Sequence, residues 1–380
     1  MDSGADRQDI SMQYYPVVEP SIGALEKKYV NDCLDTGWVG SWGKYIGEFE
    51  KAFSRFHKSK HAITTSNGTV SLHLIFLAMG IGAGDEVIVP DFTYVASANA
   101  VRYVGATPVF VDCEPDTFNI DPDAIEERLT RKTKAIMVTH IFGNPCRMDQ
   151  IMSIARRHGI PVIEDAAQAH GALFRGRLAG SFGYAGSFSF FGSKTITTGE
   201  GGMVVTNAKQ FSEKIRLLKN QGQSPRRRYY HEVLGYNYRM TNIQAAIGLA
   251  QLQRLPSIVA VKRRMHGWYQ KYLAPLADED VIRFQEETPG GKATWWVNAI
   301  VLRNAPVERL AKKLAQSGID TRPLFVPMHE IPHLKRHGDF PNSKMLSREG
   351  IILPSGVALA EKDVMHISEK VTNILHRMTA

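Results

Sequence analysis

The feature that most limits the possible folds is a regular alternation of apolar runs and helical stretches, from Ser66 to about Gln251. Four apolar, β-branched runs predict buried strands, at 86–90, 107–112, 134–140 and 160–165. Four helical stretches lie among them, at 69–79, 93–104, 121–129 and 148–158. This alternation is typical of an α/β fold, with a mostly parallel sheet covered by helices on both faces. Ligands of such sheets bind at the carboxyl ends of the strands. Here Asp91 directly follows one strand, and the other three end in Asp112, His140 and Asp165.

The C-terminal third follows a different pattern. A long basic helix at 257–273, a Trp-Trp strand at 294–302 and a helix at 307–317 predict a smaller α+β domain. We therefore expect a flexible N-terminus at 1–15, a large cofactor-binding domain at 16–255 and a small domain at 256–380. The break between the two domains is expected near Pro256.

The charge balance narrows the possible partners. The chain has 46 Lys and Arg against 38 Asp and Glu, a surplus that suits nucleic acid, an anionic membrane or a small anionic substrate. Its basic clusters, at 156–157, 226–228, 262–264 and 335–336, are short and scattered, and no nucleic-acid-binding motif accompanies them. No apolar stretch approaches the roughly 20 residues that span a bilayer. We therefore expect no nucleic acid and no membrane as partners, and a small anion as the substrate.

The cysteines and the first residues predict where the protein works. Cys33, Cys113 and Cys146 show no Cys-x-x-Cys spacing, which argues against a disulfide scaffold or a zinc ribbon, and we expect no metal site. The first residues are polar and lack the apolar core of a signal peptide. These features predict a protein of the reducing cytoplasm.

Lys194 is the first candidate for chemistry. Most lysines lie on a solvated surface, but this one follows the aromatic residues Phe188, Phe190 and Phe191 and precedes a glycine pair. A lysine in an apolar pocket has a lowered pKa and becomes a nucleophilic amine. This is what a lysine that forms a Schiff base requires.

Asp165 ends the last of the four predicted strands, and Gln168 follows three residues later. A buried Asp can keep the pyridine nitrogen of pyridoxal phosphate (PLP) protonated, and Gln168 is in reach of the same ring's hydroxyl. The alternatives are a helix N-cap for Asp165 and a surface helix position for Gln168.

Two further sites would complete a PLP pocket. Ser-Asn-Gly-Thr at 66–69 precedes a predicted helix, so Gly68 and the free N–H groups there suit a phosphate, although a turn and a cap have the same pattern. Tyr94 follows a strand and could stack on a ring or pack in the core.

Together these residues resemble the DegT/DnrJ/EryC1/StrS family of PLP-dependent sugar-nucleotide aminotransferases, which have the fold type I architecture. The resemblance extends from about Pro16 to the C-terminus. It rests on six runs: 66–69, 90–99, 164–168, 187–194 (Ser-Phe-Ser-Phe-Phe-Gly-Ser-Lys), 197–203 (Thr-Thr-Gly-Glu-Gly-Gly-Met) and 236–248.

The resemblance implies a role for each candidate. Lys194 is the Schiff-base lysine, Asp165 pairs with the pyridine nitrogen and Gln168 lies near the ring hydroxyl. The remaining contacts with PLP come from Tyr94, which stacks on the ring, and from Gly68, Thr69 and Ser189, which bind the phosphate. Asn237 reaches the phosphate in the neighbouring subunit, which implies an obligate homodimer with shared active sites. Pyridoxamine phosphate is the implied intermediate form of the cofactor.

The resemblance also implies the substrates. The most similar branch of the family transfers the amino group of L-glutamate to C4 of GDP-4-keto-6-deoxy-D-mannose, a reaction that belongs to O-antigen biosynthesis. Ser193 departs from the Asn expected there in that branch. Candidate contacts with the substrate are Arg226, Arg227, Arg228, Arg322 and His329, although solvated or structural roles suit them equally.

Other functions remain open from the sequence. These are transfer to a UDP- or dTDP-linked keto sugar, at C4 or C3, and a non-catalytic PLP-fold binding protein. The family's dehydratases have His where Lys194 stands, so the lysine favours amino transfer. A serine hydrolase is not supported, because no Gly-x-Ser-x-Gly stands at a strand-to-helix turn.

Overall fold

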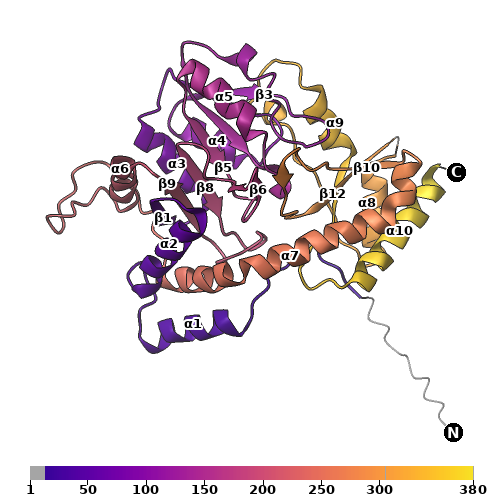
Figure 1. The fold of residues 1–380 in the computed structure, drawn as a ribbon, viewed down its shortest axis with the longest axis horizontal. Helices are drawn as coiled ribbons and strands as arrows, with labels where there is room; N and C mark the ends of the chain where they lie inside the picture. The colour runs from indigo at the N-terminus through magenta and orange to yellow at the C-terminus, as the bar shows by residue number, and fades with distance from the viewer. Residues whose placement is uncertain (1–12, 304, 380) are drawn as a thin grey trace, which may run out of the picture.

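A seven-stranded sheet forms the centre of the computed structural model, which describes residues 13–303 and 305–379 (Figure 1). Its strands, in spatial order, are β1 (His61–Thr65), β9 (Gly202–Thr206), β8 (Ala185–Ser189), β5 (Val162–Asp165), β4 (Thr133–Thr139), β2 (Glu86–Pro90) and β3 (Thr107–Val111). The pairings from β8 to β3 are all parallel, whereas β9 is antiparallel to both of its neighbours. The predicted α/β class with a mostly parallel sheet is therefore confirmed.

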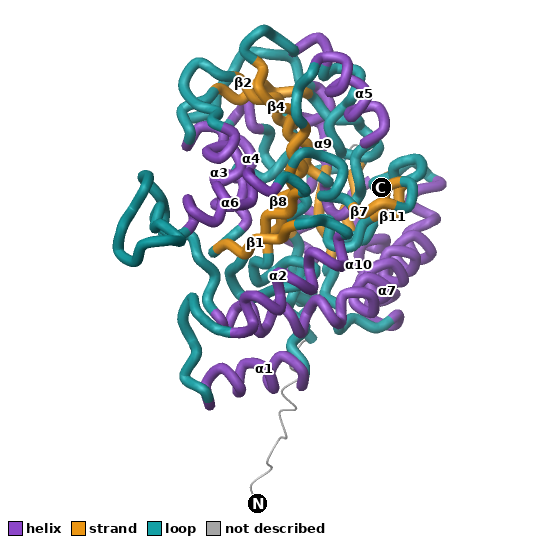
Figure 2. Tube along the Cα trace, turned by 60° about the vertical axis from the view of Figure 1, so that its left-hand side comes forward, coloured by secondary structure: helices purple, strands orange, loops and turns teal. Residues whose placement is uncertain are grey.

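Helices cover both faces of this sheet, because the side chains of each strand alternate between two apolar layers. One layer contains α3 (Gly68–Met79), α4 (Ala96–Tyr103) and α6 (Lys209–Lys219). The opposite face is covered by α5 (Met148–His158), α2 (Lys44–His57) and the first half of α7 (Asn242–Asp278). Figure 2 shows the orange strands between these purple helices, and α1 (Ala24–Asp35) packs outside α7.

The C-terminal part has a sheet of its own, as the sequence predicts. Four antiparallel strands follow one another in the order β10 (Ile282–Phe284), β12 (Asn298–Leu302), β14 (Gly350–Leu353) and β13 (Arg322–Pro323). The second half of α7 packs on this sheet with α8 (Val307–Ala315) and α10 (Glu361–Thr379). Smaller elements complete the chain: β6 (Leu173–Phe174), β7 (Arg177–Leu178), β11 (Gly291–Lys292), α9 (Pro341–Glu349) and the 3-10 turns η1 (Glu126–Arg128), η2 (Ile141–Gly143) and η3 (Met328–Glu330).

Helix α7 runs through Pro256, where the break between the two domains is expected. The helix begins at Asn242 behind a capping box formed by Thr241 and Gln244, and it continues through Pro256 (Figure 1). Leu255 belongs to the core of the large sheet and Met265 to that of the small one. One helix thus connects both parts, and packing on both sides of the proline offsets the backbone hydrogen bond that it removes. The domain limits stay a prediction.

Three other predicted elements are shorter than expected. The predicted helix at 121–129 contains only η1, since the N–H groups of Ile125, Arg128 and Leu129 donate to carbonyls three residues earlier, as in 3-10 turns, and not four residues earlier. Helix α4 begins at Ala96 and not at Thr93, whose hydroxyl instead donates a hydrogen bond to Thr139 Oγ1. The Trp-Trp run precedes β12, since Trp295 has a φ of 52°, which no strand accommodates.

Most of the flexible N-terminus predicted at 1–15 lies outside the described residues. Within the described part, Tyr15 is buried and forms a backbone bridge with Ile319. Within the described part of the chain, no helix is long and apolar enough to cross a membrane.

Candidate active site

Lys194 stands in the turn that follows β8. Its backbone N–H donates to Phe191 O at 2.9 Å, and its Nζ lies 4.0 Å from the centre of the Trp296 ring. Burial lowers the pKa of the Lys194 ammonium to about 8, against the opposing effect of the Asp165 charge. Within residues 13–303 and 305–379, no oxygen accepts a hydrogen bond from Nζ. Nζ is therefore not tied to a protein oxygen, and once neutral it can act as a nucleophile.

Asp165 is the last residue of β5, and its side chain is buried. The carboxylate accepts hydrogen bonds from Ser97 Oγ on α4, at 2.8 Å, and from the backbone N–H of Ala167, at 3.1 Å. Burial raises the pKa of Asp165, and these two bonds and the charge of Lys194 lower it in part. No helix follows Asp165 directly, so the alternative of a helix N-cap is wrong.

The residues at 66–69 form a turn against the end of β8. Asn67 caps α3, since its Oδ1 accepts the N–H of Val70 at 3.0 Å. Gly68 begins the helix, and a Cβ added there would stand 2.7 Å from Cβ of Ser189. The helix N-terminus, with half-buried Thr69, thus meets Ser189 at a distance that only glycine allows. Free N–H groups and the positive end of the helix dipole make such a place suitable for a phosphate.

Gln168 and Tyr94 lie in different surroundings. Gln168 is buried outside any helix, and its Oε1 accepts the N–H of Phe142 at 2.8 Å, so the surface-helix alternative is wrong. Its Nε2 hydrogens remain for another acceptor. Tyr94 is 57% exposed, with its ring centre 6.1 Å from that of Phe325, so it is not a core residue.

Asn237 and the three arginines belong to an arm, residues 220–237, that projects beyond α6 (Figures 1 and 2). Backbone bridges at 220–237 and 223–231 join its two sides. Arg226, Arg227 and Arg228 are exposed near its tip, and exposed Asn237 accepts hydrogen bonds from Arg239 at its base. No contact joins the three arginines to Lys194 or Asp165 among the residues described.

The other two candidate substrate contacts lie elsewhere. Arg322 is exposed on the edge strand β13. His329 is buried, and its Nδ1 lies 2.7 Å from Asp91 Oδ2, at the end of β2. Its backbone N–H also donates to Asp91 Oδ1, at 2.9 Å. This pairing ties η3 to the large sheet and favours the structural reading of His329.

A sequence model of the DegT/DnrJ/EryC1/StrS aminotransferase family matches residues 20–372. The chain belongs to this family. It is thus a PLP-dependent sugar aminotransferase, with the fold that the sequence predicts.

Two curated relatives are similar over nearly their whole length. The GDP-perosamine synthase of Caulobacter vibrioides is 46% identical over 94% of this chain and 98% of its own. That of Escherichia coli O157:H7 is 45% identical over 95% of this chain and 98% of its own.

Solved structures share the fold. The putative sugar aminotransferase Spr1654 of Streptococcus pneumoniae, in its PLP form, superposes with a TM-score of 0.90 at 27% identity, covering 96% of this chain and 100% of that one. A GDP-4-keto-6-deoxymannose-3-dehydratase (ColD), solved as a mutant with bound GDP-perosamine, gives a TM-score of 0.88 at 26% identity, covering 94% and 100%.

The residues of this aminotransferase fit PLP chemically. A lysine with a lowered pKa, a buried carboxylate and a helix N-terminus closed by Gly68 supply an amine, an anion and an anion-binding turn. When bound, PLP supplies an electron sink that stabilises a carbanion next to nitrogen.

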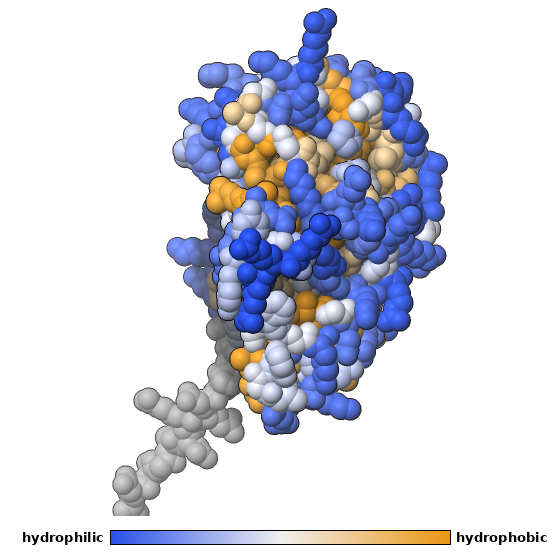
Figure 3. Space-filling model, turned by 90° about the vertical axis from the view of Figure 1, so that its left-hand side faces the viewer, coloured by the Kyte–Doolittle hydropathy of each residue, from blue (hydrophilic) through white to orange (hydrophobic). Residues whose placement is uncertain are grey.

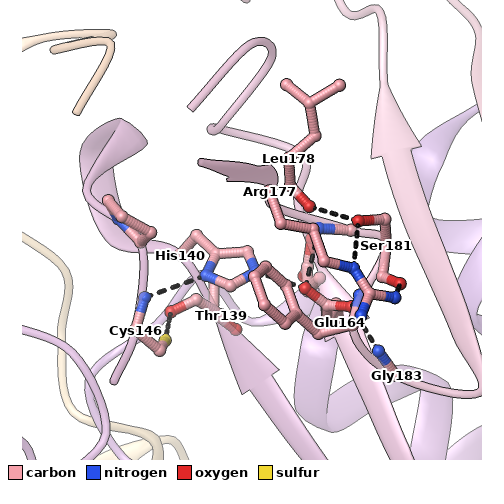
Figure 4. A network of polar contacts seen from close by, with 12 residues as sticks. Thr139, His140, Cys146, Glu164, Arg177, Leu178, Ser181 and Gly183 are labelled. Carbon is pink, nitrogen blue, oxygen red and sulfur yellow. Dashed lines mark hydrogen bonds and ion pairs between the residues drawn. The ribbon is translucent and has the colours of Figure 1, made fainter. Parts of the chain in front are cut away.

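A second acidic residue of the aminotransferase, Glu164, precedes Asp165 in β5 and, by the alternation of a strand, faces the other side of the sheet. Figure 4 shows the polar network around Glu164 and His140. Glu164 accepts the N–H groups of Gly180, Phe182 and Gly183 at 2.6–2.7 Å and meets His140 Nε2 at 3.1 Å. The N–H of Cys146 donates to His140 Nδ1, so the proton of the neutral ring is on Nε2. This network fixes the segment that leads into β8 and so supports the strand that precedes Lys194.

Sequence reasoning missed Ser97, Glu164 and Trp296. Glu164 had a usable signal, because neighbouring residues of a strand face opposite sides. Ser97 and Trp296 had none, since only the fold brings them to Asp165 and Lys194.

Proposed function

We propose that this aminotransferase transfers the amino group of L-glutamate to C4 of GDP-4-keto-6-deoxy-D-mannose and so produces GDP-perosamine. The observation that carries the proposal is the 44–46% identity, over 94–95% of the chain, to three enzymes named GDP-perosamine synthase. The likeness to ColD, a protein that accommodates GDP-perosamine, adds support. We also propose that the enzyme works in the cytoplasm and serves O-antigen synthesis.

In this proposal Lys194 carries PLP and moves the proton. Its Nζ takes a proton from Cα of glutamate in the first half-reaction and gives it up before the donor leaves as 2-oxoglutarate. In the second half-reaction Nζ delivers a proton to C4 of the sugar. An amine with a pKa near 8 suits both tasks, because both of its protonation states are accessible near neutral pH.

The remaining residues bind and orient the cofactor. The Asp165 carboxylate pairs with the protonated ring nitrogen, and Gln168 Nε2 donates to the ring hydroxyl. Tyr94 covers one face of the ring. The phosphate binds at the N-terminus of α3, to Gly68, Thr69 and Ser189.

We further propose an obligate homodimer in which the arm completes the partner's site. The arm exposes apolar side chains that water disfavours: Tyr229 and Leu234 are 78% and 84% exposed. Orange patches are visible among blue side chains on the face from which the arm projects (Figure 3). In the dimer, Asn237 would bind the partner's cofactor phosphate, and Arg226–Arg228 would approach the nucleotide pyrophosphate.

Mixing two inactive variants tests the shared site. Lys194→Ala and Asn237→Ala proteins, each impaired alone, should regain activity when unfolded together and refolded, because mixed dimers contain one intact site. No recovery despite mixed-dimer formation would contradict the shared site and leave the proposed reaction standing.

The reaction itself is tested by spectroscopy. L-glutamate should remove the visible absorption band of the PLP-loaded protein, and GDP-4-keto-6-deoxy-D-mannose should restore it with release of a 4-amino sugar. Recovery with a UDP- or dTDP-linked keto sugar alone would replace the GDP substrate. A band that glutamate never removes would favour a non-catalytic binding protein.

A further inference from the structure

Trp296 forms a wall beside the amine of Lys194. It lies in the segment before β12, far along the chain from Lys194, yet its ring centre is 4.0 Å from Nζ. The side chain is buried, and its ring also lies 6.4 Å from that of Phe142.

Three hydrogen bonds fix the position of Trp296. Its backbone N–H donates to Phe142 O at 2.8 Å, and its backbone carbonyl accepts from Lys262 Nζ at 2.9 Å. Its indole Nε1 donates to Ser193 O, at 2.6 Å, directly beside Lys194 in the chain. Lys262 is fully buried and also donates to the carbonyl of Ser355. The ring is therefore held in place before any ligand arrives.

Few groups near Nζ can stabilise a positive charge on it, which gives the Trp296 ring its importance. No oxygen of the described residues accepts a hydrogen bond from Nζ, and the acidic group that acts on its charge is Asp165. His170, the other titratable group that senses this charge, is buried and its pKa is lowered to about 3, so it stays neutral. The face of an indole ring attracts an ammonium group, and the attraction disappears when the amine is neutral.

We propose that Trp296 is a catalytic residue whose ring stabilises the Lys194 ammonium each time Nζ takes up the transferred proton. This inference rests on the proposed function. In each half-reaction the neutral amine accepts one proton from carbon and returns one to carbon, so the ammonium forms and disappears with no net proton change. The ring stabilises the ammonium and not the neutral amine. It therefore influences both how readily Nζ accepts the proton and how strongly Nζ retains that proton.

The test measures the amine directly. In full-length protein freed of cofactor, the pH dependence of Lys194 acetylation by acetic anhydride, read by peptide mass spectrometry, gives its pKa. Trp296→Leu should lower this pKa by roughly 0.4 to 1.5, because the cation–π attraction is lost. Trp296→Phe, which keeps an aromatic face but loses the bond to Ser193, should lie between the two. Trp295→Phe is the matched control, since Trp295 stacks on His266, and it should match the wild type.

Turnover gives the second readout. Trp296→Leu should lower kcat by roughly 2- to 30-fold, with a larger primary isotope effect from glutamate deuterated at Cα. Equal Lys194 pKa values in wild type and Trp296→Leu would overturn the inference even if GDP-perosamine is made at the normal rate. Equal falls in Trp296→Phe and Trp296→Leu would assign the effect to the Ser193 bond and also overturn it. Should Trp296→Leu not fold, Trp296→Met replaces it.

Discussion

Lys194, in the turn after β8, and Lys219, the last residue of α6, are two desolvated lysines, and burial lowers the pKa of each to about 8. Their partners differ. Lys219 Nζ donates to Thr64 O at 2.6 Å and lies 3.5 Å from Glu50 Oε1, whereas an aromatic ring is the neighbour of Lys194 Nζ. A lowered pKa thus shows that a lysine is buried, but it does not show that the lysine is reactive. The amine of a reactive lysine must also be free of hydrogen bonds and ion pairs that hold it to protein oxygens, as Lys219 is held.

The counter-ions differ in the same way. Glu50 accepts both the N–H and the hydroxyl of Thr64 and pairs with Arg216, and the charges of Lys219 and Arg216 keep its pKa low despite burial. This cluster holds the end of β1, just before the turn at 66–69. Asp165 has Ser97 and Ala167 as donors, and Lys194 acts on it through its charge and not through a hydrogen bond.

Replacing Lys194 should give the largest effect. Lys194→Ala removes the amine that binds PLP and moves the proton, so the rate of amino transfer should fall by about 10²- to 10⁴-fold. The thermal unfolding midpoint of the cofactor-free protein should change little, because the side chain has no hydrogen bond to the described residues and the lost attraction to the Trp296 ring is offset by the removal of a desolvated amine. Turnover at the wild-type rate would remove the central role of Lys194.

Replacing Lys219 should give the opposite pattern. Lys219→Met leaves the buried Glu50 carboxylate without one of its cations, so the free energy of unfolding should fall by about 3–5 kcal/mol. PLP should still bind covalently to the folded protein. Lys209→Met, which breaks an exposed pair with Glu213, is the control and should change stability by less than about 0.5 kcal/mol. Equal stability of the two variants would show that the Lys219 cluster is not structural.

A smaller change is expected at Ser97. Ser97→Ala removes a donor that lowers the pKa of Asp165, so this pKa should rise further. Since the ionised carboxylate is the active form, the acid limb of the kcat profile should move to higher pH. At neutral pH kcat should fall about tenfold, the equivalent of one lost hydrogen bond to a charge. Ser97→Thr retains the hydroxyl and should restore the wild-type profile, whereas an unchanged acid limb in Ser97→Ala would separate Ser97 from Asp165.

Lys194, Asp165 and Gly68 could be found from the sequence because the residues next to each of them predict its environment. These neighbours are an aromatic run before Lys194, an apolar strand before Asp165 and a helix start after Gly68. Strands β2, β3, β4 and β5 were predictable for the same reason, since apolar runs of this length suit a buried sheet, whereas β1, β8 and β9 were not predicted. The helix predicted at 121–129 was wrong, because its backbone closes 3-10 turns with hydrogen bonds to the third residue back, so no α-helical turn forms. Ser97 lies within a recognised run, but only the packing of α4 on β5 turns its hydroxyl toward Asp165.

The most direct test of the account traps the lysine that binds PLP. The loaded enzyme is reduced with borohydride, digested and sequenced by mass spectrometry. We predict that the pyridoxyl group is found on Lys194 and is absent from Lys219 and Lys262, although the pKa of both is also lowered by burial. A label on either of those lysines, or none on Lys194, would contradict the account.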